Sequence, residues 1–286
     1  MCYIDTHAHL NLKAFADDHT SVIDKCLENS VTVINVGTKL ATSERAVSIA
    51  NENKNMYATI GLHPIQTVAG RHDEEEVGEG GEAFFSKGEE FTADDYRSLA
   101  LSSDKVVGIG ECGFDYYHME KNSYLAQETA FIAQIKLANE LSLPLMIHTR
   151  NPKPGLESPT GRSVYFDVFE ILKKYAKVHG NVHFFAGTYA DAERFFSLGF
   201  TISFTGVITF AKDYEEVVKE TPLDLMHAET DSPYVAPVPY RGKRCEPWMV
   251  TKVYERIAHI KNIPLEKVRD QLSENALRHY GIQIDI

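Results

Sequence analysis

Eight short apolar runs, mostly of β-branched residues, recur along this chain and constrain its fold more than any other feature. Each has the length of one buried strand, and they cover residues 2–6, 31–36, 56–61, 106–110, 144–147, 181–185, 201–204 and 225–229. Helical periodicity is found between and after them, over residues 21–28, 42–53, 93–101, 123–141, 163–175, 190–197, 214–219, 248–260 and 265–280. Strands alternating with helices in this number predict an α/β fold, a (β/α)8 TIM barrel, with a doubly wound parallel sheet as the alternative.

The composition is that of a globular domain. The chain has 286 residues, 43% of them hydrophobic, and can bury a large core; we expect a single domain over residues 1–286. Residues 70–90 interrupt the pattern because they are rich in glycine and glutamate and show little periodicity. We interpret them as an acidic loop insertion after the third strand, solvated and partly disordered.

Charge, hydropathy and cysteine usage bear on where the protein works. No run of about eighteen apolar residues indicates a membrane span, and no basic segment before a long apolar one indicates a signal peptide. The four cysteines are scattered, which favours free thiols in a reducing compartment. We expect a cytoplasmic monomer, or a nuclear one in a eukaryote, with no membrane and no obligate protein partner. The net charge of −12 argues against broad nonspecific binding to nucleic acid.

Histidines and carboxylates follow the predicted strands at the points where the strands end. In a barrel these ends ring one face, where active sites form. His7 and His9 are two residues apart, so on an extended backbone they point to the same side. Each candidate alone is more typical of a core histidine or a turn residue, but the whole set indicates a metal site: His7, His9, Glu111, His148, His183 and Asp231.

The number of donors favours two divalent ions, Mg, Mn or Zn, over one, because a single site rarely takes more than four protein ligands. In two-metal hydrolysis a carboxylate bridges the ions, and Glu111 is the best candidate for that bridge. Asp231 can bind metal, orient the attacking water or take its proton. His63 precedes a proline, and both a substrate contact and structural packing fit that setting.

Basic side chains near these motifs are candidates for substrate binding. Arg150 follows His148 by two residues and can pair with a phosphate or form a structural ion pair. Arg241, Lys243 and Arg244 form a compact basic cluster after the eighth strand, suited to phosphate contact or to a solvated turn.

These residues, in this order, resemble the TatD family of metal-dependent deoxyribonucleases. The resemblance runs over essentially the whole chain and is carried by Asp5-Thr6-His7-Ala8-His9, Gly61-Leu62-His63-Pro64, Gly110-Glu111-Cys112-Gly113-Phe114-Asp115, Ile147-His148-Thr149-Arg150, His183-Phe184-Phe185-Ala186-Gly187 and Glu229-Thr230-Asp231-Ser232-Pro233-Tyr234. It implies a TIM barrel related to the amidohydrolases. It also implies a cytosolic 3′–5′ exonuclease acting on single-stranded DNA ends with a metal-activated water. The metal ligands that it implies are His7, His9, Glu111, His148, His183 and Asp231.

Other functions fit the same residues. A second hypothesis is a hydrolase of another ester or amide, such as D-aminoacyl-tRNA, a phosphotriester or a cyclic amide, since the metals do not dictate the leaving group. A third is a non-enzymatic binding protein, against which the complete set of ligands argues. Arg150 and the basic cluster favour a phosphate-bearing substrate, and the net charge disfavours long polymers.

Overall fold

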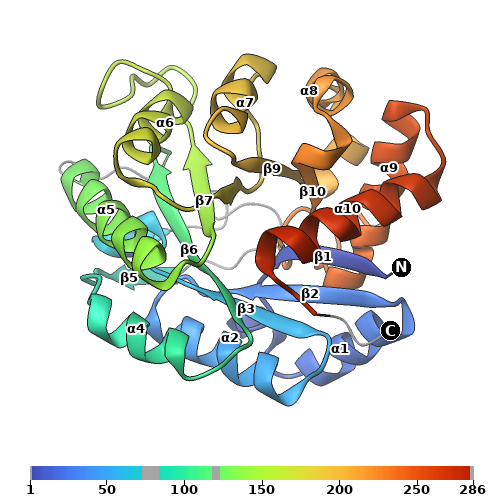
Figure 1. Ribbon diagram of the computed structural model, residues 1–286, viewed down its shortest axis with the longest axis horizontal. Coiled ribbons are helices and arrows are strands. Elements are labelled where there is room, and N and C mark those ends of the chain that lie inside the picture. Colours follow the sequence, from blue (N-terminus) through green and yellow to red (C-terminus); the bar gives the residue numbers. More distant parts are fainter. Residues whose placement is uncertain (1, 73–83, 118–122, 284–286) are drawn as a thin grey trace.

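The computed structural model describes residues 2–72, 84–117 and 123–283, and these form the predicted (β/α)8 barrel (Figure 1). Within them, eight parallel strands pair in the order β1-β2-β3-β6-β7-β8-β9-β10. The strands are β1 (Tyr3–Ala8), β2 (Val31–Val36), β3 (Met56–Ile60), β6 (Val106–Asp115), β7 (Leu145–Arg150), β8 (Gly180–Val182), β9 (Thr201–Phe204) and β10 (Met226–Ala228).

Helices surround the strands on the outside of the barrel (Figure 1). They are α1 (His19–Glu28), α2 (Leu40–Glu52), α4 (Ala93–Leu101), α5 (Ser123–Leu141), α6 (Val164–Tyr175), α7 (Tyr189–Phe196), α8 (Glu215–Glu220), α9 (Val250–Lys261) and α10 (Leu265–Tyr280). Short 3-10 turns lie between them, among them η2 (Pro64–Thr67) and η3 (Gly206–Thr209). The main core fills the layer between strands and helices. No helix of the described residues is long and apolar enough to span a membrane.

The barrel closes where the first strand meets the segment that follows the last. Ala8 and Ser232 form a parallel bridge there. The amide of Asp231 donates to the carbonyl of His7, and the amide of His9 donates to the carbonyl of Ser232, both at 2.9 Å. Closure of the fold therefore brings two predicted histidine ligands beside a predicted carboxylate ligand.

Several strand ends differ from the prediction: β1 continues to Ala8 and β7 to Arg150, so that His7 and His148 lie within strands. The ends of β6 and β8 also differ, and both differences shape the site. β6 does not end at Gly110 but continues through Glu111 to Asp115, with a register shift against β7 between Ile109 and Cys112. Gly110 has φ +136°, and a Cβ there would lie 2.2 Å from the carbonyl of Met146, so only glycine fits.

β8 is shorter than predicted because the chain turns directly after it. Phe184 adopts φ +44°, a left-handed conformation that ends the strand. Its amide donates at 2.7 Å to the carboxylate of Glu229, outside the strand ladder. His183 thus sits at the turn and not within a strand as the sequence suggested.

The acidic insertion lies partly outside the described residues, which leave out 73–83. On either side of that gap, β4 (Ala69–His72) and β5 (Phe84–Lys87) pair as an antiparallel ladder, which the weak periodicity did not predict. Glu89 is not simply solvated, because its Oε1 accepts from the amide of Leu40 at 3.0 Å, at the start of α2.

The amino-terminal end of the barrel is closed by apolar packing. Side chains from inside β1, β2, β3, β6 and β7 pack against the end of α10, where Tyr280 is buried. The opposite end, where the strands finish, carries the polar residues described next.

Candidate metal centre

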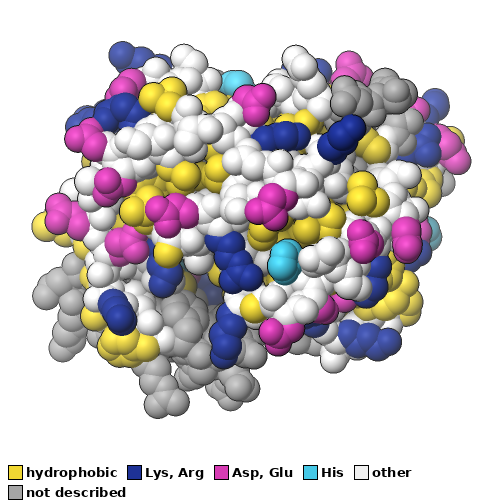
Figure 2. All heavy atoms as spheres, turned by 90° about the horizontal axis from the view of Figure 1, so that it is seen from below, with side chains coloured by type: hydrophobic (Ala, Val, Ile, Leu, Met, Phe, Trp, Pro, Cys, Tyr) yellow, Lys and Arg dark blue, Asp and Glu magenta, His cyan; other side chains and the backbone are white. Residues whose placement is uncertain are grey.

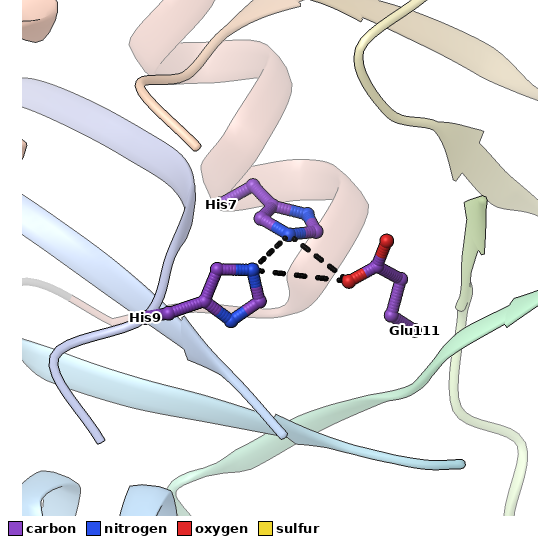
Figure 3. A group of neighbouring side chains, drawn as sticks. All are labelled: His7, His9 and Glu111. Atoms are coloured by element: carbon purple, nitrogen blue, oxygen red, sulfur yellow. Dashed lines mark hydrogen bonds and ion pairs between the residues drawn. The ribbon is translucent and has the colours of Figure 1, made fainter. Parts of the chain in front are cut away.

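The predicted donors converge at the carboxyl ends of the strands. Donor atoms of His7, His9 and Glu111 lie within 4.8 Å of one another, as do those of Glu111, His148 and His183. On the first side, Glu111 Oε2 lies 3.4 Å from His7 Nε2 and 3.8 Å from His9 Nε2. Figure 3 shows that the other oxygen of Glu111 points away from both rings. The carboxylate therefore presents its two oxygens to two different places.

The second oxygen meets another pair of imidazoles. Glu111 Oε1 lies 2.7 Å from His148 Nδ1 and 2.7 Å from His183 Nε2. Those two nitrogens are 3.3 Å apart. Glu111 is thus shared between two groups of donors, the arrangement expected of a bridging ligand between two ions.

Asp231 completes the first group. Its Oδ1 lies 3.4 Å from His9 Nε2 and 3.6 Å from His7 Nε2, which are themselves 3.1 Å apart. Asp231 has φ +55°, and its amide donates a hydrogen bond to the carbonyl of His7. Its side chain is 13% exposed, so it faces the mouth of the barrel and remains open to a substrate or a water.

The outward nitrogens of two imidazoles are held by acceptors. Nδ1 of His9 is 2.8 Å from the carbonyl of Val36, and Nε2 of His148 is 3.1 Å from Oδ2 of Asp115. Because a carbonyl or a carboxylate can only accept, the outward nitrogen of these two rings carries the proton and the inward nitrogen of the neutral ring presents a lone pair. Nδ1 of His183 lies 3.3 Å from Oε1 of Glu229 without a hydrogen bond to it.

The unprotonated inward nitrogens of these imidazoles can coordinate a bound cation. Lone pairs that face carboxylate oxygens repel one another unless positive charge lies between them. Burial lowers the pKa of His9, but the hydrogen bond and charge of Asp231 outweigh burial and raise it above the ordinary value. The pKa of His183 is likewise raised, against burial, by Glu111 and Glu229. Nitrogen and oxygen donors of this kind could hold a divalent metal ion.

His63 lies against the cluster in a different role. The amide of Ile65 donates to its Nδ1 at 3.2 Å, so in the neutral ring the proton is on Nε2. Burial lowers the pKa of His63 to about 4, which keeps the ring neutral near pH 7. Its Nε2 lies 3.2 Å from Glu111 Oε1. In the neutral ring His63 therefore presents a hydrogen-bond donor to Glu111, and a donor atom of His63 also lies within 4.8 Å of donor atoms of Asp115 and His148.

The carboxylates that orient the histidines were not predicted as functional residues. Asp115 and Glu229 stand in the quoted motifs, but the sequence analysis assigned them no role. A third buried carboxylate, Asp5, accepts from the amide of Thr230 at 2.9 Å and from its hydroxyl at 2.6 Å, which holds the segment before Asp231. One signal could have revealed all three, because a carboxylate at the end of an apolar strand is costly to bury without a donor.

The basic candidates separate into two kinds. Arg244 forms a bidentate ion pair with Asp18, at 2.9 and 2.6 Å, and donates to the carbonyl of Ala14. This gives Arg244 the structural role instead of the predicted substrate contact. Arg241 stacks on Phe210 at 3.8 Å, and Lys243 is exposed in the same turn.

Arg150 ends β7, two residues beyond His148. Its guanidinium carbon lies 4.0 Å from the centre of the Tyr117 ring. It therefore lies on the face of the barrel that carries the cluster, as predicted.

A barrel with imidazoles and carboxylates gathered at its carboxyl-terminal face is typical of metal-dependent hydrolases. A family model described as TatD related DNase matches residues 4–281, and the chain belongs to this TatD family of metal-dependent hydrolases. This chain is 35% identical to YabD of Bacillus subtilis, an uncharacterized metal-dependent hydrolase, over 97% of this chain and 98% of that protein. It is 29% identical to YcfH of Escherichia coli, also an uncharacterized metal-dependent hydrolase, over 99% of this chain and 97% of that protein. The crystal structure of YJJV, a TatD homologue from Escherichia coli, has a TM-score of 0.79 at 22% identity and covers 98% of each chain. The predicted family and barrel are thereby confirmed.

Proposed function

We propose that this protein is a divalent-metal-dependent deoxyribonuclease that removes nucleotides from the 3′ end of single-stranded DNA. The observation that carries the proposal is the position of Glu111, whose Oε2 faces His7 and His9 while its Oε1 faces His148 and His183. A shared carboxylate between two donor groups is the arrangement that two-metal phosphodiester hydrolysis uses.

The choice of a DNA end rests on the family and on the charge of the molecule. The family description that matches this chain is that of a DNase. The net charge is −12, and on the face in Figure 2 the described basic and acidic side chains are interspersed without a continuous basic surface. A long duplex needs such a surface, whereas a short single-stranded end needs only local contacts at the site.

Each ion would have its own set of residues in this proposal. His7, His9, Asp231 and Glu111 would hold one, and His148, His183 and Glu111 would hold the other. Bound there, the ions would supply Lewis acidity to the phosphodiester and to a water.

Two side chains act on the substrate directly. Asp231 is partly exposed and lies beside the cluster, so its carboxylate can accept the proton of the attacking water. His63 carries its proton on Nε2 and can donate it as a hydrogen bond to a phosphate oxygen, which gains charge as the bond to the leaving nucleotide breaks. The role of His63 is matched to the neutral ring that its lowered pKa gives near pH 7.

The decisive experiment is digestion of oligodeoxynucleotides by metal-stripped protein to which Mg²⁺, Mn²⁺ or Zn²⁺ is restored. Substrates labelled at the 5′ or the 3′ end, single- or double-stranded, report polarity and strand preference. We expect a ladder shortened from the 3′ end, lost in Glu111→Ala and retained in Glu170→Ala, which removes an exposed carboxylate of α6. Two bound ions per chain without digestion would instead favour the hydrolysis of another ester or an amide.

A further inference from the structure

The carboxylate of Glu229 lies at one end of a chain of buried hydrogen bonds that crosses β8, β9 and β10. Ser203 Oγ lies 2.6 Å from Glu229 Oε2, and Asn181 Nδ2 lies 2.7 Å from Ser203 Oγ. Asn181 Oδ1 lies 3.1 Å from Thr201 Oγ1, which in turn lies 3.0 Å from His227 Nε2. Each of these five side chains belongs to a residue that is at most 7% exposed. The chain is therefore shielded from water along its whole length.

The carboxylate fixes the direction of every hydrogen bond in this chain. Because a carboxylate can only accept, Ser203 donates its single hydroxyl proton to Glu229 and must itself accept from the side-chain amide of Asn181. The carbonyl oxygen of Asn181 then accepts from the hydroxyl of Thr201. Thr201 accepts from Nε2 of His227, a ring that burial keeps neutral by lowering its pKa to about 3. All the donors thus point toward Glu229, and hydrogen bonds aligned in this way strengthen one another.

Glu229 connects this chain to the turn that carries His183. Its Oε1 accepts from the amide of Phe184 at 2.7 Å, and Phe184 has the left-handed φ of +44° that ends β8. The same oxygen lies 3.3 Å from His183 Nδ1. One oxygen of the carboxylate is held by the turn and the other by Ser203, so the carboxylate cannot rotate without breaking one of these two bonds. The orientation of a predicted metal ligand thus depends on a hydroxyl that acts through Glu229.

The geometry points to Ser203 and Asn181 as positioning residues for the donor group that contains His183. Ser203 holds the carboxylate that fixes the turn, and Asn181 keeps the hydroxyl of Ser203 aimed at that carboxylate. The other donor group is held separately, because Nδ1 of His9 meets the carbonyl of Val36 on β2. This inference rests on the metal centre of the proposed function, and it does not depend on DNA being the substrate.

Amide hydrogen exchange of the metal-free protein, followed by NMR, tests the proposal without any metal. Ser203→Ala frees one oxygen of the carboxylate, so the amide of Phe184 should exchange about tenfold faster, the effect of weakening one hydrogen bond to a charged group. The amide of Phe185 is the internal control, because it donates at 2.9 Å to the backbone carbonyl of Ser203, which the substitution leaves in place. Unchanged exchange at Phe184, or an equal increase at Phe185, would overturn the proposal.

Calorimetric titration of the metal-stripped protein with Mn²⁺ measures the consequence at the centre. We expect Ser203→Ala to weaken one site about tenfold, the lower end of the usual loss when a partner of a metal-bound histidine is removed, and to leave the other site unchanged. Ser273→Ala is the matched control, because Ser273 is equally buried and its hydroxyl donates to the carbonyl of Cys2 at 2.5 Å. Equal weakening of both sites, or a loss as large in Ser273→Ala, would count against the positioning role.

Asn181→Asp tests the second residue by reversing one donor at nearly constant shape. The new carboxylate faces Ser203 with an acceptor, so one hydroxyl proton must serve two carboxylates. Faster exchange at Phe184 and one weakened Mn²⁺ site are again expected, and wild-type values for both in the folded variant would remove Asn181 from the proposal. This pattern in both variants supports the positioning role even if the wild type cleaves no DNA, a result that would contradict the nuclease alone.

Discussion

Replacing Asp115 with asparagine tests whether a buried carboxylate sets the protonation of a predicted metal ligand. Both oxygens of Asp115 face N–H donors, Nε2 of His148 at 3.1 Å and the amide of Tyr117 at 2.9 Å. A carboxamide replaces one acceptor with an NH2 group, which must then face one of these donors. The amide of Tyr117 cannot reverse, but the imidazole can move its proton to Nδ1. That nitrogen faces Glu111, where a proton blocks a metal ion.

The expected magnitude follows from the bond that is lost. A buried hydrogen bond to a charged group contributes about 1.5–3 kcal/mol. At about 1.4 kcal/mol per tenfold, this corresponds to roughly 10- to 100-fold in a binding constant, the usual cost of removing the carboxylate partner of a metal-bound histidine. Calorimetric titration of metal-stripped Asp115→Asn with Mn²⁺ should therefore show one weakened site and one unchanged site.

Asp167→Asn is the matched control for this substitution. Asp167 is equally buried, but its described partners are the hydroxyls of Tyr116 and Thr160 and the guanidinium of Arg162. Both variants should lower the thermal midpoint, and only Asp115→Asn should weaken Mn²⁺ binding. Unchanged Mn²⁺ affinity in Asp115→Asn, or an equal loss in Asp167→Asn, would refute the reasoning.

Four further predictions address the rest of the centre. Glu111→Ala should remove both metal sites and lower nuclease activity by more than about 100-fold, because even partners outside the ligand set cost 10- to 100-fold; Mn²⁺ stoichiometry near two in this variant would contradict the bridge. His63→Gln should lower kcat by about 100-fold without changing Mn²⁺ affinity, since this ring is a donor and not a ligand; a parallel loss of Mn²⁺ binding would make it a ligand. The pKa values of His9, His148 and His183 are raised above the ordinary 6.5, and a protonated ring cannot bind metal, so Mn²⁺ affinity should rise as the pH increases above about 6.5; calorimetry at increasing pH that shows no change in affinity would count against this. Arg244→Gln should destabilise the fold by about 0.5–1 kcal/mol in urea, because its ion pair with Asp18 is partly exposed, and should leave KM for DNA unchanged; an increase in KM would restore its substrate role.

The sequence predicted most of the fold because the barrel repeats one local pattern. Residues 31–36, 93–101, 123–141, 201–204 and 265–280 were predicted with the bounds that the structure has. The misses occur where a long-range contact overrides the local pattern. β6 continues through its glycines because it remains paired with β7, and β8 stops early because the amide of Phe184 bonds to Glu229.

Candidate residues were easier to predict than their partners. His7 and His9 point to one place because side chains two apart share one side of a strand, and parallel strands bring the other candidates to the same face. The metal roles themselves remain predictions. A carboxylate at the end of an apolar strand could have marked Asp115 and Glu229 as functional residues, but the donors that they accept from could not be predicted. The ion pair of Arg244 could not be predicted either, since each of these contacts joins separate elements.

The sequence by itself determined the kinds of donor, their spacing along each strand and the alternation that makes a barrel. These are local properties, because hydrophobic period and residue type act over a few residues. Only the tertiary structure decided which atoms meet. Thr230 donates a hydrogen bond to Asp5, 225 residues away in the sequence, and Arg244 donates one to Asp18, 226 residues away. Barrel closure joins the two ends of the chain, and with them His7, His9 and Asp231. The direction in which His9 and His148 present their lone pairs follows from Val36 and Asp115 on neighbouring strands, and the resulting cluster could hold metal ions.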